Sequence, residues 1–384
     1  MKKVFITAGL SILLLLLVGM ECLAECEGDL DHDGNVNKSD LSLLAEDFGR
    51  TDCTTGPLCE ADIHPIDIPD GDVDGSDAAV FGVDFGRTGC SLPVPLNLFN
   101  IGNSIGEGEA ALNNMGNPNH EVVWSTGYDP VDMVYSLNKR FEDVDPSGYW
   151  ENDALRDGIL NRAVSGSEMV DLATQANEVI AAADATPTGK VGMLTTLIGN
   201  NDVCAPGLND MTDPALFELQ YRAGLDVLAA SDATKNAHIH VSGIPAIYWL
   251  WNAKRTDWLC TFIWFFVPCG NLLAAPANDC ADGGSHLDPD NIHPGDGDNC
   301  IRRKQFHAKI RDIYNPILRD VLMEYVFDGR LPNAYYVDIL DIQFDDIHVN
   351  DSDCFHPSAE GHELLAQEQW CRSPWGLDDP FCLP

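Results

Sequence analysis

Apolar runs that resemble β-strands alternate with helix-like patterns along most of this 384-residue chain, and this alternation constrains its fold most strongly. The predicted strands are 96–101, 121–125, 191–198, 238–242 and 334–339, and the predicted helices are 168–183, 214–230, 302–325 and 359–370. Strands that alternate with helices form a parallel sheet covered by helices on both faces, with sites at the carboxyl ends of the strands. The chain from residue 96 is therefore predicted to be an α/β protein with three layers, an α/β/α sandwich.

Asp353 and His356 place a carboxylate and an imidazole three residues apart near the C-terminus. On a helix or turn this spacing brings both side chains to one face. The carboxylate then orients the imidazole, whose free ring nitrogen can take a proton from a nucleophile. We expect His362 to belong to the following helix, and His238 and His240 to share one face of a strand rather than to bind a metal.

Three upstream segments supply the other parts that acyl transfer requires. The segment 102–106, Gly-Asn-Ser-Ile-Gly, follows a predicted strand and places Ser104 in a tight glycine turn. Gly166 precedes a predicted helix and offers an unhindered backbone N–H, while Asn201 lies at the end of the strand 191–198. Backbone N–H groups and an Asn amide can together form an oxyanion hole.

These four segments, in this order, resemble the blocks of the SGNH (GDSL-type) hydrolases, a family with a flavodoxin-like fold, over roughly residues 95–372. The resemblance implies that Ser104 is the nucleophile, Asp353 the triad acid and His356 the base. It also implies that the Ser104 and Gly166 N–H groups and the Asn201 side chain are the oxyanion donors. It implies no cofactor for the chemistry. The first block usually reads Gly-Asp-Ser, and here Asn103 replaces the acid. Because the triad acid comes from the last block, the mechanism does not depend on this position.

Three segments, 198–204, 244–251 and 353–362, further resemble the phospholipase B-like branch of that family, which implies lipid or simple acyl esters as substrates. We therefore predict a secreted serine esterase or lipase that works through a Ser-His-Asp triad and an acyl-enzyme. One alternative is a carbohydrate esterase that removes acetyl groups from polysaccharide. Another is a non-catalytic binding protein that keeps the fold, which Asn103 favours.

Residues 1–24 are typical of a secretory signal peptide, with two lysines, an apolar core and cleavage after Ala24. Export predicts a secreted or periplasmic protein.

Of the thirteen cysteines, twelve follow the predicted signal peptide, and an even number in an exported chain indicates disulfides. Proximity in sequence suggests three pairs, which are Cys26 with Cys53, Cys59 with Cys90, and Cys260 with Cys269. The net charge of −39 excludes the basic face that nucleic-acid binding requires.

A duplicated acidic motif occupies residues 25–91, because Cys26-Glu-Gly-Asp29 recurs as Cys59-Glu-Ala-Asp62. The oxygen ligands expected in the first loop are Asp29, Asp31, Asp33, the Asn35 carbonyl, Asn37 and Asp40, with Gly34 at the sharp turn. The second loop keeps Asp70, Asp72, Asp74 and Asp77, while an insert at 64–66 disrupts its first half and leaves Asp62 and Asp67 as uncertain ligands.

This duplicated loop and helix resembles a dockerin module, which implies structural calcium and a cohesin-like protein partner. Residues 92–95 then form a Pro-containing linker, and 96–384 form the hydrolase domain.

Within the hydrolase domain the run 258–274 is strongly apolar. It can be a lid or acyl-binding wall, or buried core, and we favour core because exposed apolar patches are uncommon. No apolar run after the signal is long enough to span a membrane.

Overall fold

The computed structural model describes residues 26, 28–30, 36–53, 59, 61–63, 70–86, 94–131, 133–144, 160–186, 188–273, 279–376, 379 and 381–382. The predicted signal peptide lies outside these residues, as do the predicted calcium ligands Asp31, Asp33, Asn35 and Asp67. The chain divides into two compact units, Val94–Leu377 and Met1–Pro93 with Asp378–Pro384. No described helix is both long and apolar enough to cross a lipid bilayer.

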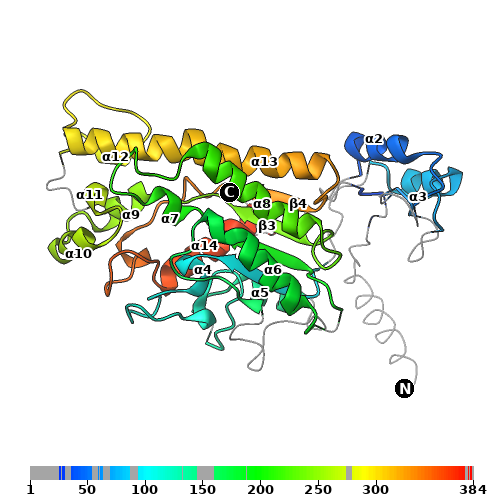
Figure 1. The fold of residues 1–384 in the computed structure, drawn as a ribbon, viewed down its shortest axis with the longest axis horizontal. Helices are drawn as coiled ribbons and strands as arrows, with labels where there is room; N and C mark the ends of the chain where they lie inside the picture. The colour runs from blue at the N-terminus through cyan, green and yellow to red at the C-terminus, as the bar shows by residue number, and fades with distance from the viewer. Residues whose placement is uncertain are drawn as a thin grey trace, which may run out of the picture. The chain divides into compact units, whose positions relative to one another are not determined.

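The larger unit contains a four-stranded parallel sheet in the order β1-β2-β3-β4. Figure 1 labels two of these strands, β3 and β4, among the helices of this unit. Its strands are β1 (Leu98–Gly102), β2 (Met193–Leu197), β3 (His238–Ser242) and β4 (Ala334–Val337). Every residue of β1 and β2 is buried, as expected for strands covered on both faces. The register pairs Gly102 with Leu197, so β1 and β2 end side by side. The parallel α/β/α architecture is confirmed.

Helices form in all four predicted helical regions, and two further helices, at residues 137–144 and 247–254, were not predicted. The larger ones are α5 (Leu137–Val144), α6 (Leu172–Ala183), α8 (Pro214–Ala229), α9 (Ile247–Lys254), α12 (Asp298–Lys309), α13 (Asn315–Phe327) and α14 (Ala359–Cys371). Helix α8 packs between α6 and α13. Helix α14 contacts β3 through Gln369, which accepts hydrogen bonds from His240 and Ser242. The core thus lies between the sheet and its two helical layers.

Two predicted elements differ from the structure. The expected strand 121–125 is wrong, because His120–Val122 forms the 3₁₀ helix η1 and the next backbone groups bond to helices. Trp124 N–H, for example, donates to His362, so this buried apolar run has no strand partner. The predicted helix 302–325 begins earlier and contains a π-helical turn, η6 (Ile310–Tyr314), just before Pro316. Proline cannot donate the helical hydrogen bond and its ring displaces the preceding turn, which explains the irregularity.

The smaller unit shows the sequence duplication as a structural one. Its helices α2 (Lys38–Asp47) and α3 (Gly75–Asp84) each begin with a capping box. Gly49 N–H donates to Val73 O at 2.7 Å, and Gly86 N–H donates to Val36 O at 2.8 Å, which are equivalent bonds in the two copies. A small apolar core joins the copies and contains Cys26, Leu30, Val36, Leu44, Cys59, Ala61, Val73 and Phe81.

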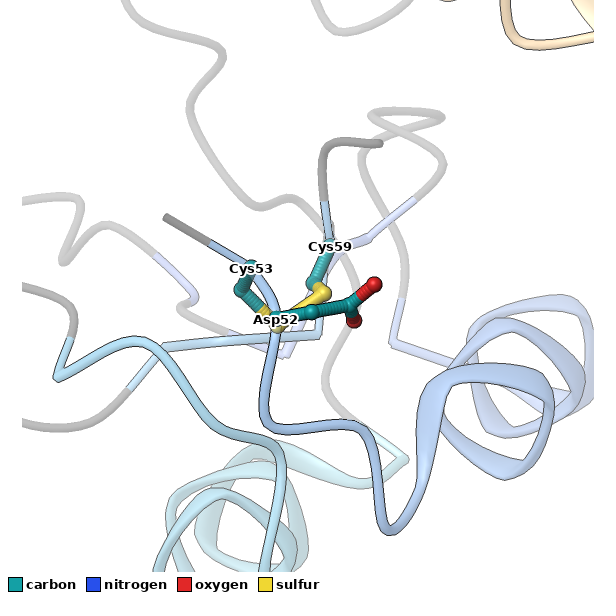
Figure 2. A group of neighbouring side chains, drawn as sticks. All are labelled: Asp52, Cys53 and Cys59. Atoms are coloured by element: carbon teal, nitrogen blue, oxygen red, sulfur yellow. A yellow bond between two sulfur atoms is a disulfide. The ribbon is translucent and has the colours of Figure 1, made fainter. Parts of the chain in front are cut away.

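Disulfides connect distant parts of the chain. The disulfides include Cys53–Cys59, Cys204–Cys269, Cys260–Cys354 and Cys280–Cys300, and Cys26, Cys371 and Cys382 are also disulfide-bonded. All three pairings expected from proximity are wrong, because Cys53 bonds Cys59 (Figure 2) and neither Cys260 nor Cys269 bonds the other. Their true partners lie 94 and 65 residues away, a proximity that only the tertiary fold creates.

The apolar run forms α10 (Trp258–Ile263), η4 (Trp264–Phe266) and α11 (Gly270–Leu273). Trp264 is fully buried and its indole N–H donates to Cys354 O at 2.7 Å. Trp258, Phe262, Phe265 and Phe266 are exposed. The core interpretation is therefore correct for Trp264 and wrong for these four side chains.

Candidate active site

Ser104 is held at the carboxyl end of β1 by a turn that only glycine and a capping residue allow. Gly102 has φ +146°, and a Cβ there would lie 2.4 Å from Leu197 O. Asn103 Oδ1 accepts a hydrogen bond from Ile105 N–H at 3.0 Å and caps the short helix α4 (Ser104–Glu107). An aspartate would cap this helix through the same oxygen, so Asn103 preserves the turn that presents Ser104.

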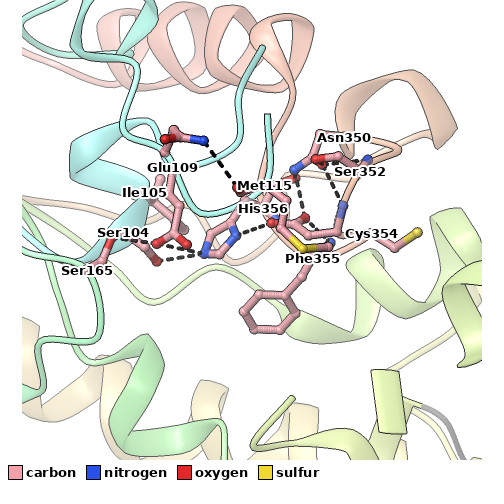
Figure 3. Close-up of polar contacts among 12 residues, drawn as sticks. Ser104, Ile105, Glu109, Met115, Ser165, Asn350, Ser352, Cys354, Phe355 and His356 are labelled. Atoms are coloured by element: carbon pink, nitrogen blue, oxygen red, sulfur yellow. Dashed lines mark hydrogen bonds and ion pairs between the residues drawn. The ribbon is translucent and has the colours of Figure 1, made fainter. Parts of the chain in front are cut away.

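Ser104, His356 and Asp353 form one continuous hydrogen-bonded chain. Figure 3 shows Ser104 beside the His356 ring. His356 Nε2 lies 2.8 Å from Ser104 Oγ, and His356 Nδ1 lies 2.7 Å from Asp353 Oδ2. The serine is 252 residues from the histidine in sequence, so the fold alone brings them together. This is the geometry in which an imidazole can take a proton from a serine hydroxyl while a carboxylate fixes the ring.

The turn at residues 350–356 surrounds the second oxygen of Asp353 with donors. Asp353 Oδ1 accepts from Asn350 Nδ2 at 2.8 Å, Phe355 N–H at 2.8 Å and His356 N–H at 3.0 Å. Burial opposes ionisation of this carboxyl, but the His356 ring and these N–H donors outweigh it and lower the pKa of Asp353 below its ordinary value. Asp353 therefore stays charged against the imidazole. Asn350 was not predicted, because its position three residues before Asp353 carries no motif.

The predicted oxyanion donors lie at two neighbouring strand ends. Asn201 is in the short helix α7 (Asn200–Val203) after β2, and its Nδ2 donates to Ser167 O at 2.8 Å. That bond uses one of its two N–H groups and ties it to the Gly166 loop. Gly166 has φ +82° with open space where a Cβ would be, and Val164 N–H anchors its loop to Gly102 O. Ser104 and Asn201 line one cavity, and Gly166 and Asn201 line an adjoining hollow.

Two glutamates beside this loop were not predicted. Ser165 Oγ contacts the carboxylates of both Glu107 and Glu109. Glu109 Oε2 also lies 4.0 Å from His356 Nε2 (Figure 3). Glu107 ends α4 and Glu109 follows its C-cap, and the spacing of the two does not distinguish them from an ordinary acidic surface turn. Its position next to the imidazole is visible only in the folded chain.

The cavity at Ser104 is lined mainly by apolar side chains. They include Ile105, Ile247, Leu250, Phe344, Val349 and Phe355. An apolar wall next to a serine hydroxyl suits the hydrocarbon part of an acyl group.

The remaining histidines of interest are buried and neutral. Burial lowers the pKa of His240 to about 4 and that of His362 to about 3. His240 is in β3, between Tyr335 and Gln369, and His362 is in α14, as predicted. Neither contacts Ser104 among the described residues, so His356 alone has the geometry of a base there.

In the first predicted calcium loop, Asp29, Asn37 and Asp40 are described. Asp29 and Asp40 are buried, and the Asp40 carboxylate accepts from Leu30 N–H and Asn37 N–H. These bonds bring the two ends of the loop together. The other ligands predicted for this loop, Asp31, Asp33 and the Asn35 carbonyl, lie outside the described residues.

The second loop gathers more of its predicted ligands. Asp72, Asp74 and Asp77 each offer an oxygen within 4.8 Å of the others. Among the described residues, Asp62 Oδ1 is buried without a hydrogen-bond partner, and burial together with the charges of Asp77 and Asp70 raises the pKa of Asp62. A buried oxygen with no donor, next to other carboxylates, is the chemistry that a hard cation satisfies. Asp52 also approaches Cys53 and Cys59, but those sulfurs are bonded to each other and offer no thiolate (Figure 2).

Comparison with protein families gives a match over the larger unit. Residues 98–368 match the family of GDSL-like lipases and acylhydrolases, a range that contains Ser104, Gly166, Asn201, Asp353 and His356. No curated protein matches the chain. The matched range covers most of the larger unit and all four strands of its sheet. The chain therefore belongs to the GDSL-like lipase/acylhydrolase family.

Proposed function

We propose that this protein is a secreted serine esterase in which Ser104, His356 and Asp353 act as the catalytic triad. Membership of the GDSL-like family indicates hydrolysis of acyl esters. The observation that carries the specific assignment is the chain of two short hydrogen bonds from Ser104 Oγ through His356 to Asp353.

Acylation begins when His356 Nε2 takes the hydroxyl proton of Ser104 as its Oγ attacks the ester carbonyl carbon. The carbonyl oxygen becomes an oxyanion, which the N–H groups of Ser104 and Gly166 and the Asn201 amide stabilise. The intermediate then expels the alcohol, which receives the proton from His356. Asp353 remains ionised throughout and stabilises the imidazolium.

Deacylation repeats these steps with water as the nucleophile. His356 takes a proton from the water as its oxygen attacks the acyl-Ser104 carbonyl carbon. The new oxyanion occupies the same donors, the bond to Ser104 Oγ breaks, and His356 returns a proton to that oxygen. The products are a carboxylic acid and free enzyme.

Lipid-like or simple acyl esters are the proposed substrates, because the cavity beside Ser104 is lined by aliphatic and aromatic side chains. The test is a series of nitrophenyl esters from acetate to palmitate. Hydrolysis that extends to medium or long chains supports this assignment. Activity confined to acetate would favour the carbohydrate acetyl esterase, which the dockerin-like duplication suggests. Absence of turnover across the series would favour a non-catalytic binding protein.

We further propose that the smaller unit is a dockerin-like module that binds structural calcium and a cohesin-like partner. Asp62, Asp72, Asp74 and Asp77 would hold one ion, because the last three offer oxygens within 4.8 Å of one another and Asp62 Oδ1 is buried without a hydrogen-bond partner among the described residues. The test is calorimetric calcium titration of the full chain and of the double variant Asp62→Asn/Asp72→Asn. Asp52→Asn is the control, because Asp52 is exposed and pairs with Arg50.

Loss of one bound calcium in the double variant, with the control unchanged, is the expected result. Unaltered binding in the double variant would contradict this site. A chelator should loosen the module and leave ester hydrolysis intact, because the proposed ligands and the triad belong to different units. Loss of hydrolysis on chelation would contradict this independence.

A further inference from the structure

The exposed side chains of α10 and η4 form a patch that a soluble surface rarely carries. Trp258 is 79 % exposed, Phe262 56 %, Phe265 64 % and Phe266 77 %. We call these four side chains the aromatic patch. Single exposed apolar residues are normal, but four aromatic rings within nine residues of chain indicate a surface that binds something.

The patch is part of a rigid element and not of a loose loop. Between the exposed rings, Trp264 is buried and donates its indole N–H to Cys354 O. Asp257 caps α10 by accepting from Leu259 N–H at 2.8 Å. The buried Trp264 in η4 and the capped start of α10 therefore hold in place the segment that carries the exposed rings.

Two disulfides attach this element to the two sides of the active site. Cys260 in α10 bonds Cys354, which follows Asp353 in the turn that carries the triad acid. Cys269, just after η4, bonds Cys204, which lines the cavity together with Ser104. A surface that docks on the patch is thereby brought next to the apolar entrance of the site.

Charge identifies the kind of partner. The chain carries a net charge of −39, yet residues 258–273 contain no charged side chain. An anionic surface would be repelled by the rest of the molecule, and a cationic protein partner would find no carboxylate in the patch itself. Aromatic rings concentrate at the boundary between lipid headgroups and acyl chains, where neutral and zwitterionic lipids present no net charge.

We propose that the aromatic patch docks this enzyme onto an uncharged or zwitterionic lipid–water interface, so that esters assembled in bilayers or micelles are its substrates. This inference rests on the proposed esterase function and names its substrate class. The docked interface would lie beside the apolar cavity at Ser104, and its esters would enter the cavity from there.

The test is co-sedimentation of the full-length protein with phosphatidylcholine vesicles. The variant Trp258→Ser/Phe266→Ser removes the two most exposed rings of the patch. Its partition coefficient should fall by on the order of tenfold or more, because each ring loses its apolar contact with the lipid. Phe327→Ser is the matched control, since Phe327 is 82 % exposed on α13 and should not affect binding.

Vesicles that contain phosphatidylglycerol should bind more weakly at low salt. Wild-type protein that does not sediment with phosphatidylcholine, or a patch variant that sediments like wild type, would overturn the proposal. A dimer seen by analytical ultracentrifugation, lost in the variant and without vesicle binding, would assign the patch to a second copy of the chain and also overturn it.

Hydrolysis separates this proposal from the proposed function. The patch variant should hydrolyse dissolved nitrophenyl acetate like wild type and lose activity only on vesicular or micellar long-chain esters. If the wild-type protein hydrolyses nitrophenyl acetate but does not bind vesicles, only the docking proposal is contradicted and the esterase assignment stands. Vesicle binding by a protein that hydrolyses no ester would support the docking surface but refute the esterase, and with it the inference that the docked lipids are substrates.

Discussion

The turn that carries Asp353 and the short helix α7 that carries Asp202 both bury a carboxylate next to a residue of the proposed site, but the surroundings of these two carboxylates affect their charge in opposite ways. Asp353 receives three N–H donors on one oxygen and the His356 ring on the other, and its pKa is lowered. Asp202 accepts from Met169 N–H at 2.7 Å, while its Oδ1 has no hydrogen-bond partner among the described residues. Burial there dominates and raises the pKa of Asp202 to about 6.

This difference shows that burial alone does not determine what a carboxylate can do. Donors make Asp353 a permanent anion, which is what a histidine base requires of its partner. Asp202 instead carries an unfavourable charge at neutral pH. Its effect is therefore on the stability of the fold, and this effect depends on pH. Each of the following changes tests one side of this contrast.

The largest effect is expected from Asp353→Asn. An amide keeps the shape but cannot stabilise the imidazolium or hold its tautomer, so kcat should fall by about 10⁴-fold. Kinetics with a dissolved nitrophenyl ester measure this loss. Asp351→Asn is the control, because Asp351 bonds Lys254 and its removal should change kcat little. Equal losses in the two variants would mean that general negative charge, and not the Asp353 contact, matters.

A smaller loss is expected from Asn201→Ala, which removes the proposed side-chain donor next to Asp202. Deleting one oxyanion donor costs about 10²- to 10³-fold in kcat. Asn200→Ala is the control, since Asn200 lines the same cavity from the adjacent position. A change confined to KM would show that Asn201 positions substrate without stabilising the oxyanion.

The smallest effect concerns Asp202→Asn, which should raise stability at neutral pH. The pKa of Asp202 is about 6 in the folded chain against an ordinary 3.8, so the folded state binds the proton more tightly. The loss of folding stability caused by ionising Asp202 is absent well below pH 3.8, grows as the pH rises, and is complete above about pH 6. The variant should gain up to about 3 kcal/mol of unfolding free energy at pH 8 and nothing near pH 4. Denaturant unfolding at both pH values measures it, and a gain independent of pH would contradict this explanation.

Much of the fold could be predicted because its strands are short apolar runs, and three of them, β1, β2 and β3, end at or within two residues of a glycine. Those strand ends also indicated where Ser104 and Asn201 would lie, since parallel strands end on one edge of the sheet. The segment 121–125 misled the prediction because burial against helix α14 gives the same apolar run as a strand. Periodicity cannot separate the two cases.

Features that depend on distant contacts could not be predicted. Cys260 bonds Cys354 across 94 residues, and nothing in cysteine spacing indicates this pair. Asn350 and Glu109 lie next to the triad only after the chain folds. The aromatic patch shows the same limit, because Trp264 and Phe265 are adjacent and equally apolar, yet one is buried and the other exposed.

The most direct test of the proposed triad is labelling by a serine-directed phosphonate, read by intact mass and peptide mapping. Wild-type protein should gain one adduct on Ser104 and lose ester hydrolysis in proportion. Ser104→Ala should gain none and should lose hydrolysis by several orders of magnitude while it melts like wild type. The control variant Ser165→Ala removes a neighbouring serine but keeps Ser104, so it should still be labelled on Ser104. An adduct on another residue, or wild-type turnover in Ser104→Ala, would contradict the account.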